Sequence, residues 1–284
     1  ALATAIIATA TTGFASVATA AERSELTIHP KEFTTFVRNF NPYLGATHLH
    51  TTWDFLYEPV VVFNEMHGNT PVFRLAENFK MSDDLMSVVF DIRKAVKWSD
   101  GETFSADDVV FSFNLVKEKP ELDQSGINSW VTSVEKLNDY QVRFNLTEAN
   151  SNAPYEIAKV PVVPKHIWKD VKDPSTFTNE NPVGSGPFTE IDTFTAQLYI
   201  QCANPNYWDA DNLDVDCLRV PQIANNDQFL GKIVNGEMDW TSSFVPDLDR
   251  TYAAASPKHH YWYPPAGTQA FVVNFKHPDA AKHE

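Results

Sequence analysis

One segment of the chain, residues 86–120, constrains the fold more than any other, because it joins a β-strand to a helix with a defined start and end. The apolar run from Met86 to Ile92 predicts the strand. Ser105 can cap the helix, with Asp108 three residues later as the acid of a capping box. Apolar side chains spaced i, i+4 and i+7 then give the helix one buried face, and Pro120 ends it.

The remaining elements do not alternate strictly between strand and helix. A second amphipathic helix begins at Asp227 and ends before Gly236, a residue type that suits the position just after a helix. Further strands are predicted at residues 26–28, 131–136, 140–146 and 271–275. This mixture predicts an α/β fold.

The first twenty residues read as a secretory leader. Residues 1–20 carry no charge, are rich in Ala and Thr, and end in Ala18-Thr19-Ala20, an A-x-A cleavage pattern with Ala21 as the mature start. A transmembrane helix is the alternative, but the stretch is weakly apolar for one. We therefore expect a signal peptide and a periplasmic protein, free of a lipid anchor because residue 21 is not cysteine.

The chain is acidic, and this limits its partners. It holds 22 Lys and Arg against 37 Asp and Glu, a formal net charge of −15. Such a charge disfavours nucleic acid and anionic lipid as partners and helps solubility.

Two cysteines, Cys202 and Cys217, each lie in a strand-like segment, with a polar turn-rich loop between them. An oxidising compartment favours a disulfide, which would stabilise the fold by about 3 kcal/mol in the chain-entropy model. Two buried free thiols are the alternative. A metal site is disfavoured because no third cysteine or histidine shares the spacing.

Residues that could carry catalysis are sparse. The adjacent pair Asp107-Asp108 is explained by a helix start, since neighbours on a helix do not face one another. His48 and His50 could share one face of a strand but have no third metal ligand at a fixed spacing. No phosphate-binding loop, dinucleotide fingerprint or nucleophile elbow occurs. We therefore expect a binding protein with no catalytic residue, cofactor or metal.

Four local patterns, in this order, resemble the bacterial extracellular solute-binding proteins of family 5, which include peptide and oligosaccharide receptors of ABC importers. The patterns occupy residues 98–113, 182–188, 204–208 and 230–239. The resemblance implies the α/β fold of a periplasmic binding protein, with two lobes joined by a hinge. Residues 21–284 would then form the N-terminal lobe up to the hinge region, without the second lobe.

Within this family the chain is similar to receptors of the chitin-oligosaccharide-binding type, at residues 25–33, 38–42, 221–227 and 238–244. This similarity implies a monomeric receptor that captures chitooligosaccharides by domain closure and delivers them to an ABC permease; a membrane sensor kinase is a further partner that it allows. An oligopeptide or dipeptide receptor of the same family is one alternative. A secreted glycoside hydrolase is another, and it would need two carboxylates facing across the cleft.

The predicted ligand contacts combine aromatic faces, which stack on sugar rings, with amides and hydroxyls, which bind ring oxygens. All lie after predicted strands, where ligands collect in open α/β sheets. The predicted ligand-binding residues are Asn39, Phe40, Asn225, Asn226, Trp240, Ser242 and Phe244. The alternatives are core packing for the aromatic residues and helix capping for Asn225 or Asn226.

Overall fold

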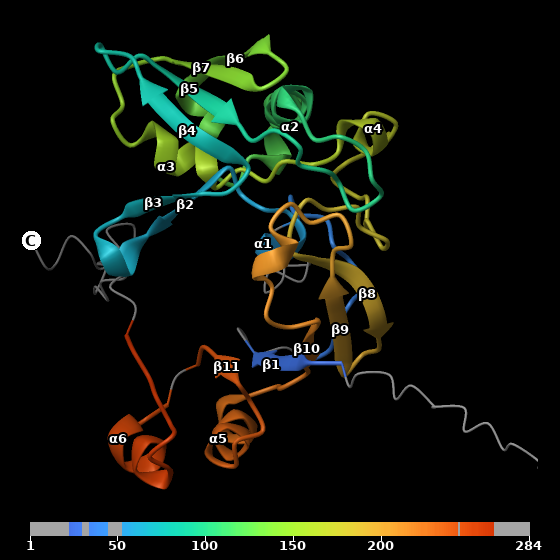
Figure 1. Ribbon diagram of the computed structural model, residues 1–284, viewed down its shortest axis with the longest axis vertical. Coiled ribbons are helices and arrows are strands. Elements are labelled where there is room, and N and C mark those ends of the chain that lie inside the picture. The colour runs from blue at the N-terminus through green and yellow to red at the C-terminus, as the bar shows by residue number, and fades with distance from the viewer. Residues whose placement is uncertain (1–22, 30–33, 45–52, 244, 264–284) are drawn as a thin grey trace, which may run out of the picture.

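The structure, a computed structural model, describes residues 23–29, 34–44, 53–243 and 245–263 (Figure 1). The predicted leader, the predicted strand 271–275 and Phe244 lie outside these residues. The strands are β1 (Glu25–His29), β2 (Val61–Asn64), β3 (Thr70–Phe73), β4 (Ala76–Met81), β5 (Ser87–Ile92), β6 (Val131–Asn138), β7 (Gln141–Leu146), β8 (Phe188–Phe194), β9 (Leu198–Ala203), β10 (Cys217–Pro221) and β11 (Trp240–Thr241). The helices are α1 (Trp53–Leu56), α2 (Ala106–Glu118), α3 (Ala153–Ala158), α4 (Lys165–Trp168), α5 (Asn226–Val234) and α6 (Leu248–Thr251), with short 3₁₀ turns between some elements.

A five-stranded sheet brings the first and last strands of the described chain together. Its order is β11-β1-β10-β9-β8, so the first strand lies in the interior of the sheet. β1 runs parallel to both neighbours, with Glu25 opposite Cys217 and Ile28 opposite Trp240. β10, β9 and β8 pair antiparallel. The carboxyl ends of β1, β10 and β11 therefore lie at one edge of this sheet.

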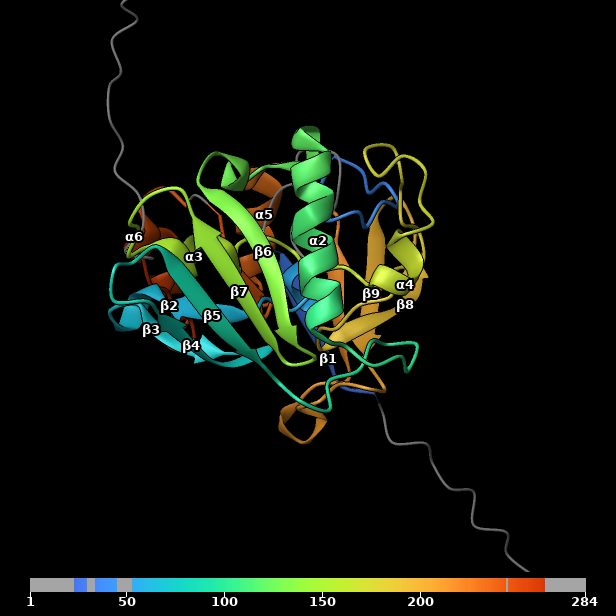
Figure 2. The same ribbon diagram turned by 90° about the horizontal axis from the view of Figure 1, so that it is seen from above.

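A four-stranded antiparallel sheet, in the order β4-β5-β7-β6, forms a second body covered by α2 (Figure 2). β5 and β7 alternate between buried and half-buried residues, so their apolar side chains point toward the helix. Phe113 of α2 packs edge-on against Phe144 of β7 at 4.7 Å between ring centroids, and Phe90 of β5 meets the same ring at 5.7 Å. This aromatic contact fixes the helix on the sheet.

Helix α2 begins with the capping box that the sequence predicts. The Ser105 hydroxyl accepts a hydrogen bond from the Asp107 N–H at 3.2 Å, and the Asp108 carboxylate accepts one from the Ser105 N–H at 2.9 Å. The second oxygen of Asp108 accepts the Lys165 N–H at 3.0 Å, which ties α4 to the start of α2. Burial raises the pKa of Asp108.

The two sheets meet where backbone passes close to backbone. The Gly186 N–H donates to the Leu56 carbonyl at 2.9 Å. A Cβ atom on Gly184 would lie 2.1 Å from the Leu56 oxygen, and one on Gly186 would lie 2.2 Å from the Phe55 oxygen. Only glycine fits at either position. This segment, part of the second family pattern, therefore makes a tight backbone contact with α1.

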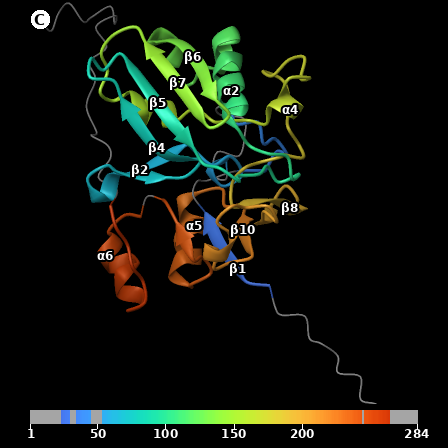
Figure 3. The ribbon, with the colours of Figure 1, turned by 45° about the horizontal axis from the view of Figure 1, so that its top comes forward.

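Two apolar cores hold the molecule together. The larger one runs continuously through both sheets and buries one face of α2. The smaller one lies beside the five-stranded sheet, on the side away from the four-stranded sheet (Figure 3). It joins Phe229 and Ile233 of α5 to Met238, Val245 and Tyr252 near β11 and α6. Among the residues that the structure describes, no helix has the length and apolar character needed to cross a membrane.

A candidate ligand-binding surface at the strand ends

The edge where the parallel strands end is the candidate site, and we call it the carboxyl edge: His29, residues 222–226 and residues 240–243. Its loops are hydrogen-bonded to one another. The Thr241 hydroxyl donates to the His29 carbonyl at 2.6 Å, and the Ser242 N–H donates to the same oxygen at 3.2 Å. The chain after β11 is therefore fixed against the end of β1.

The asparagines at the start of α5 belong to this edge. Asn225 is the N-cap, and its side-chain oxygen accepts the Gln228 N–H at 3.0 Å. The Asn226 side-chain oxygen accepts the Ser243 hydroxyl at 2.8 Å. Both asparagines are exposed. The structure thus joins the loop after β10 to the loop after β11, and it confirms the capping role that the sequence left open for Asn225.

Trp240 supplies the aromatic surface of the carboxyl edge. Its side chain is 39% exposed, in keeping with the position of β11 as a short edge strand of the five-stranded sheet. Ser242 is exposed two residues later. Trp240 and Ser242 are two positions apart, so their side chains point to the same side, because side chains alternate along an extended chain. An indole, a hydroxyl and two amides therefore face solvent at one edge.

Asn39 and Phe40 do not lie with these residues. They are 6% and 2% exposed. The Phe40 N–H donates to the Thr178 carbonyl at 2.9 Å, and its ring packs edge-on against Phe194. The Asn39 side-chain oxygen accepts the Asn41 N–H at 3.0 Å. Asn39 lies ten positions after His29, the last residue of β1, and both side chains belong to the core.

Charged groups close to the carboxyl edge are few among the described residues. Asp227 is exposed in the first turn of α5. The Asp239 carboxylate accepts the Thr27 N–H at 2.7 Å, before β11 begins. Within the described ranges, no group of three or more His, Cys, Asp or Glu side chains is placed to hold a metal ion. The chemistry offered at this edge is hydrogen bonding by neutral groups and stacking on an aromatic face.

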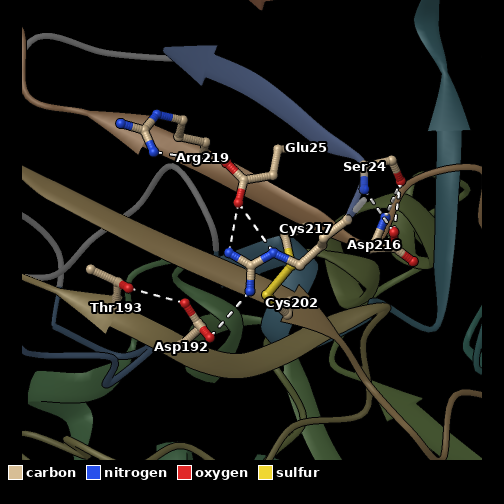
Figure 4. A network of polar contacts seen from close by, with 9 residues as sticks. Ser24, Glu25, Asp192, Thr193, Cys202, Asp216, Cys217 and Arg219 are labelled. Atoms are coloured by element: carbon tan, nitrogen blue, oxygen red, sulfur yellow. Dashed lines mark hydrogen bonds and ion pairs between the residues drawn. A yellow bond between two sulfur atoms is a disulfide. The ribbon is translucent and has the colours of Figure 1, made fainter. Parts of the chain in front are cut away.

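The disulfide lies at the amino end of β1, where Cys217 is opposite Glu25. Figure 4 shows it with the polar groups around it. Cys202 and Cys217 are opposite each other on β9 and β10 and are joined, as predicted. Arg23 lies beside them, with ion pairs to Glu25 at 2.6 Å and to Asp192 at 3.2 Å. This polar network surrounds the amino end of β1, so the disulfide supports the sheet and takes no part in the carboxyl edge.

One buried polar cluster was missed by sequence reasoning. Glu58 is 3% exposed and pairs with Arg74 at 2.6 Å. It also accepts the Tyr207 hydroxyl and the Trp208 N–H, each at 2.7 Å. Arg93 lies over the Trp208 ring at 3.9 Å from its centroid. Burial, reinforced by Glu58, raises the pKa of Tyr207.

This cluster has a structural role, and so do Asp107 and Asp108, the two consecutive acidic residues at the start of α2. Glu58 is neutralised by Arg74, and Asp107 is neutralised by Lys136 at 2.5 Å and Lys165 at 3.2 Å. Asp108 is occupied by the capping box. The aromatic pair of the third sequence pattern, at positions 207 and 208, was the only signal that pointed toward the cluster.

Comparison with known proteins places the chain in a family. Residues 70–283 match the profile of the bacterial extracellular solute-binding proteins, family 5 middle region. The peptidoglycan-binding protein YepA of Agrobacterium fabrum is 32% identical over 161 residues, which cover 55% of this chain and 26% of the relative. A putative ABC transporter peptide-binding protein of Brucella ovis is 29% identical over 212 residues, covering 72% of this chain and 39% of the relative.

Solved structures share the fold. A mannohexaose-bound periplasmic oligopeptide-binding protein of an ABC transporter from Thermotoga maritima matches with a TM-score of 0.72 and 24% identity, over 83% of this chain and 45% of that protein. The oligopeptide-binding protein AppA of Bacillus subtilis, in complex with a nonapeptide, matches with a TM-score of 0.63 and 24% identity, over 82% and 46%. The chain spans less than half the length of each of these proteins. It belongs to the bacterial extracellular solute-binding proteins of family 5.

Proposed function

We propose that this chain is part of the periplasmic solute-binding receptor of an ABC importer and that it breaks no bond in its ligand. The observation that carries the proposal is the carboxyl edge of a family 5 fold, where an exposed indole lies beside amides and hydroxyls. Ligand bound there would gain further contacts when a second lobe closes over it. The difference between the two sets of contacts would then shift the population to the closed state.

The composition of the carboxyl edge favours a neutral oligosaccharide, and we propose chitooligosaccharides as the ligand. Trp240 offers an apolar face for a pyranose ring, and Asn225 and Ser242 offer groups that bind acetamide and hydroxyl oxygens. Sugar binding has a parallel in the fold, since the Thermotoga protein holds mannohexaose.

An oligopeptide is the second candidate, and the comparisons favour it over chitooligosaccharides. The Brucella relative is named as peptide-binding, and the Bacillus structure holds a nonapeptide. A peptide needs charged partners for its termini. Asp227, exposed beside Asn226 at the start of α5, could pair with an amino terminus.

Calorimetry on the full-length protein separates these candidates. Chitobiose, chitotetraose, a dipeptide and a nonapeptide are titrated under one condition, and the sugar samples are then analysed for shorter products. Saturable heat with a chitooligosaccharide and no shortening supports the proposal. Binding heat with a peptide but with no sugar would show that the ligand is a peptide. Shortened sugar would refute the transport role.

Asn225 allows ligand contact to be separated from helix capping. Asn225→Ser keeps a side chain that caps well but removes the amide. We expect the variant to melt at the wild-type temperature and to bind chitotetraose more weakly. Asn225→Ala loses both functions and serves as the comparison. Wild-type affinity in Asn225→Ser would show that this residue only caps α5.

A further inference from the structure

The exposed aromatic side chains of the described residues fall in one short stretch of the chain, residues 240–263. Within residues 23–29, 34–44, 55–243 and 245–263, the exposed ones are Trp240, Tyr261, Trp262 and Tyr263, at 39%, 40%, 52% and 74%. Every other aromatic residue in these ranges is buried or half-buried. Three of the four, Tyr261–Tyr263, are consecutive, and contiguous exposed apolar groups mark interaction sites in soluble proteins.

The aromatic segment Tyr261–Tyr263 is held by defined contacts. Tyr252, which belongs to the small core around α5, stacks on His259 with ring centroids 4.3 Å apart and ring planes 2° apart. The His259 ring is also hydrogen-bonded to the Tyr252 carbonyl at 2.8 Å. The Tyr261 hydroxyl donates to the Asp249 carboxylate of α6. The segment is therefore attached to the smaller apolar core, which also packs α5, the helix that Asn225 caps.

The segment also lies on the side of the five-stranded sheet toward which β1 runs. In Figures 1 and 3, β1 runs toward the side on which α6 lies, and in Figure 1 the stretch after α6 passes that side on its way toward the β2–β3 hairpin. The carboxyl ends of β1, β10 and β11 lie on this side, because the three strands are parallel. Side chains alternate along an extended chain. The rings of Tyr261 and Tyr263 meet at 5.7 Å, and Trp262 lies between them in the sequence, so it points the other way.

We propose that Tyr261–Tyr263 is a second stacking subsite, with Trp262 as its main platform, and that it lengthens the site from Trp240 to accept an oligosaccharide of several rings. The inference rests on the proposed sugar ligand. An indole and a phenol present flat apolar faces with polar edges. Such faces suit a pyranose ring better than they suit an extended peptide backbone. Trp240 would hold one ring of the oligomer and Trp262 another.

The test uses the full-length protein and three variants. Trp262→Ala removes the platform, Trp262→Phe restores a flat ring, and Val72→Ala is the control, because Val72 is 42% exposed on the β2–β3 hairpin. Affinities for chitobiose and chitohexaose are measured by calorimetry. We expect Trp262→Ala to lose about tenfold in chitohexaose affinity and clearly less for chitobiose, as expected for one lost stacking contact. Trp262→Phe should recover most of the loss.

A second measurement needs no variant. Wild-type protein is treated with a tryptophan-oxidising reagent with and without chitohexaose, and the oxidised positions are mapped by mass spectrometry. We expect ligand to protect both Trp240 and Trp262. Unchanged chitohexaose affinity in Trp262→Ala, or oxidation of Trp262 that ligand does not slow, overturns the subsite while the proposed function stands. No sugar binding by the wild type overturns both.

Discussion

The buried cluster around Glu58 gives the sharpest prediction about the scaffold. Its carboxylate accepts hydrogen bonds from Arg74, Tyr207 and Trp208, all between 2.6 and 2.7 Å. Glu58→Gln keeps the shape but turns one oxygen into an NH₂ group, which must then face a donor. The guanidinium of Arg74, whose side chain is only 25% exposed, also loses its closest counter-charge.

The expected loss of unfolding free energy follows from these contacts. Breaking a buried ion pair by removing one partner costs about 3–5 kcal/mol. Because Arg74 keeps some contact with solvent and Asp209 lies 3.9 Å away as a weaker partner, we expect the lower end of that range, about 3 kcal/mol.

Urea unfolding of the full-length wild type and Glu58→Gln measures this difference. The matched control is Glu237→Gln, which breaks the exposed pair with Lys232 at 2.7 Å and should leave the unfolding curve unchanged. If Glu58→Gln loses less than about 1 kcal/mol, the argument from buried charge is wrong.

Three further predictions concern the same scaffold. Serine at both cysteines should cost about 3 kcal/mol of unfolding free energy, since the disulfide spans 15 residues, and a loss under 1 kcal/mol by urea unfolding would contradict this. Gly186→Ala should cost about 1–3 kcal/mol because its Cβ meets the Phe55 carbonyl, whereas Gly231→Ala, in open space on α5, should be neutral or stabilising. The neighbours Asp107 and Asp108 should titrate on opposite sides of the ordinary aspartate pKa by carboxyl NMR, because hydrogen bonds from Lys136 lower the first and burial raises the second. The Asp107 contribution to stability should thus fade as pH falls, and that of Asp108 as pH rises through its folded-state pKa; coincident midpoints would contradict both.

Local features were predictable from the sequence because their causes lie within a few residues. Helix α2 starts at the predicted cap, and α5 starts one residue before Asp227, the predicted start. Gly236 lies just after that helix, as predicted, in the left-handed conformation with φ of 72°. In each case a side chain or a glycine satisfies the backbone of its own turn. No distant contact is needed to specify it.

The sheet order could not be predicted in the same way. β1 pairs with two strands about 190 and 210 residues later, and short parallel strands carry no signal that names their partners. The same limit applies to the candidate site. The sequence predicts that Asn39 and Phe40 contact ligand after the first strand, but both are buried in the core, with Phe40 against Phe194. The aromatic segment that begins at Tyr261 was overlooked because its exposure depends on how α6 packs.

The sequence patterns that identify the family meet at one place, and this explains why they reveal the fold but not the ligand. The Ser99 N–H donates to the Gly184 carbonyl at 2.9 Å, and the Asn206 amide donates to the Ser99 carbonyl at 2.9 Å. The Asn204 amide donates to the Gly186 carbonyl at 3.0 Å. Three of the four patterns therefore form the joint between the two sheets. The carboxyl edge lies on loops outside this joint, so its residues can change with the ligand while the joint stays the same.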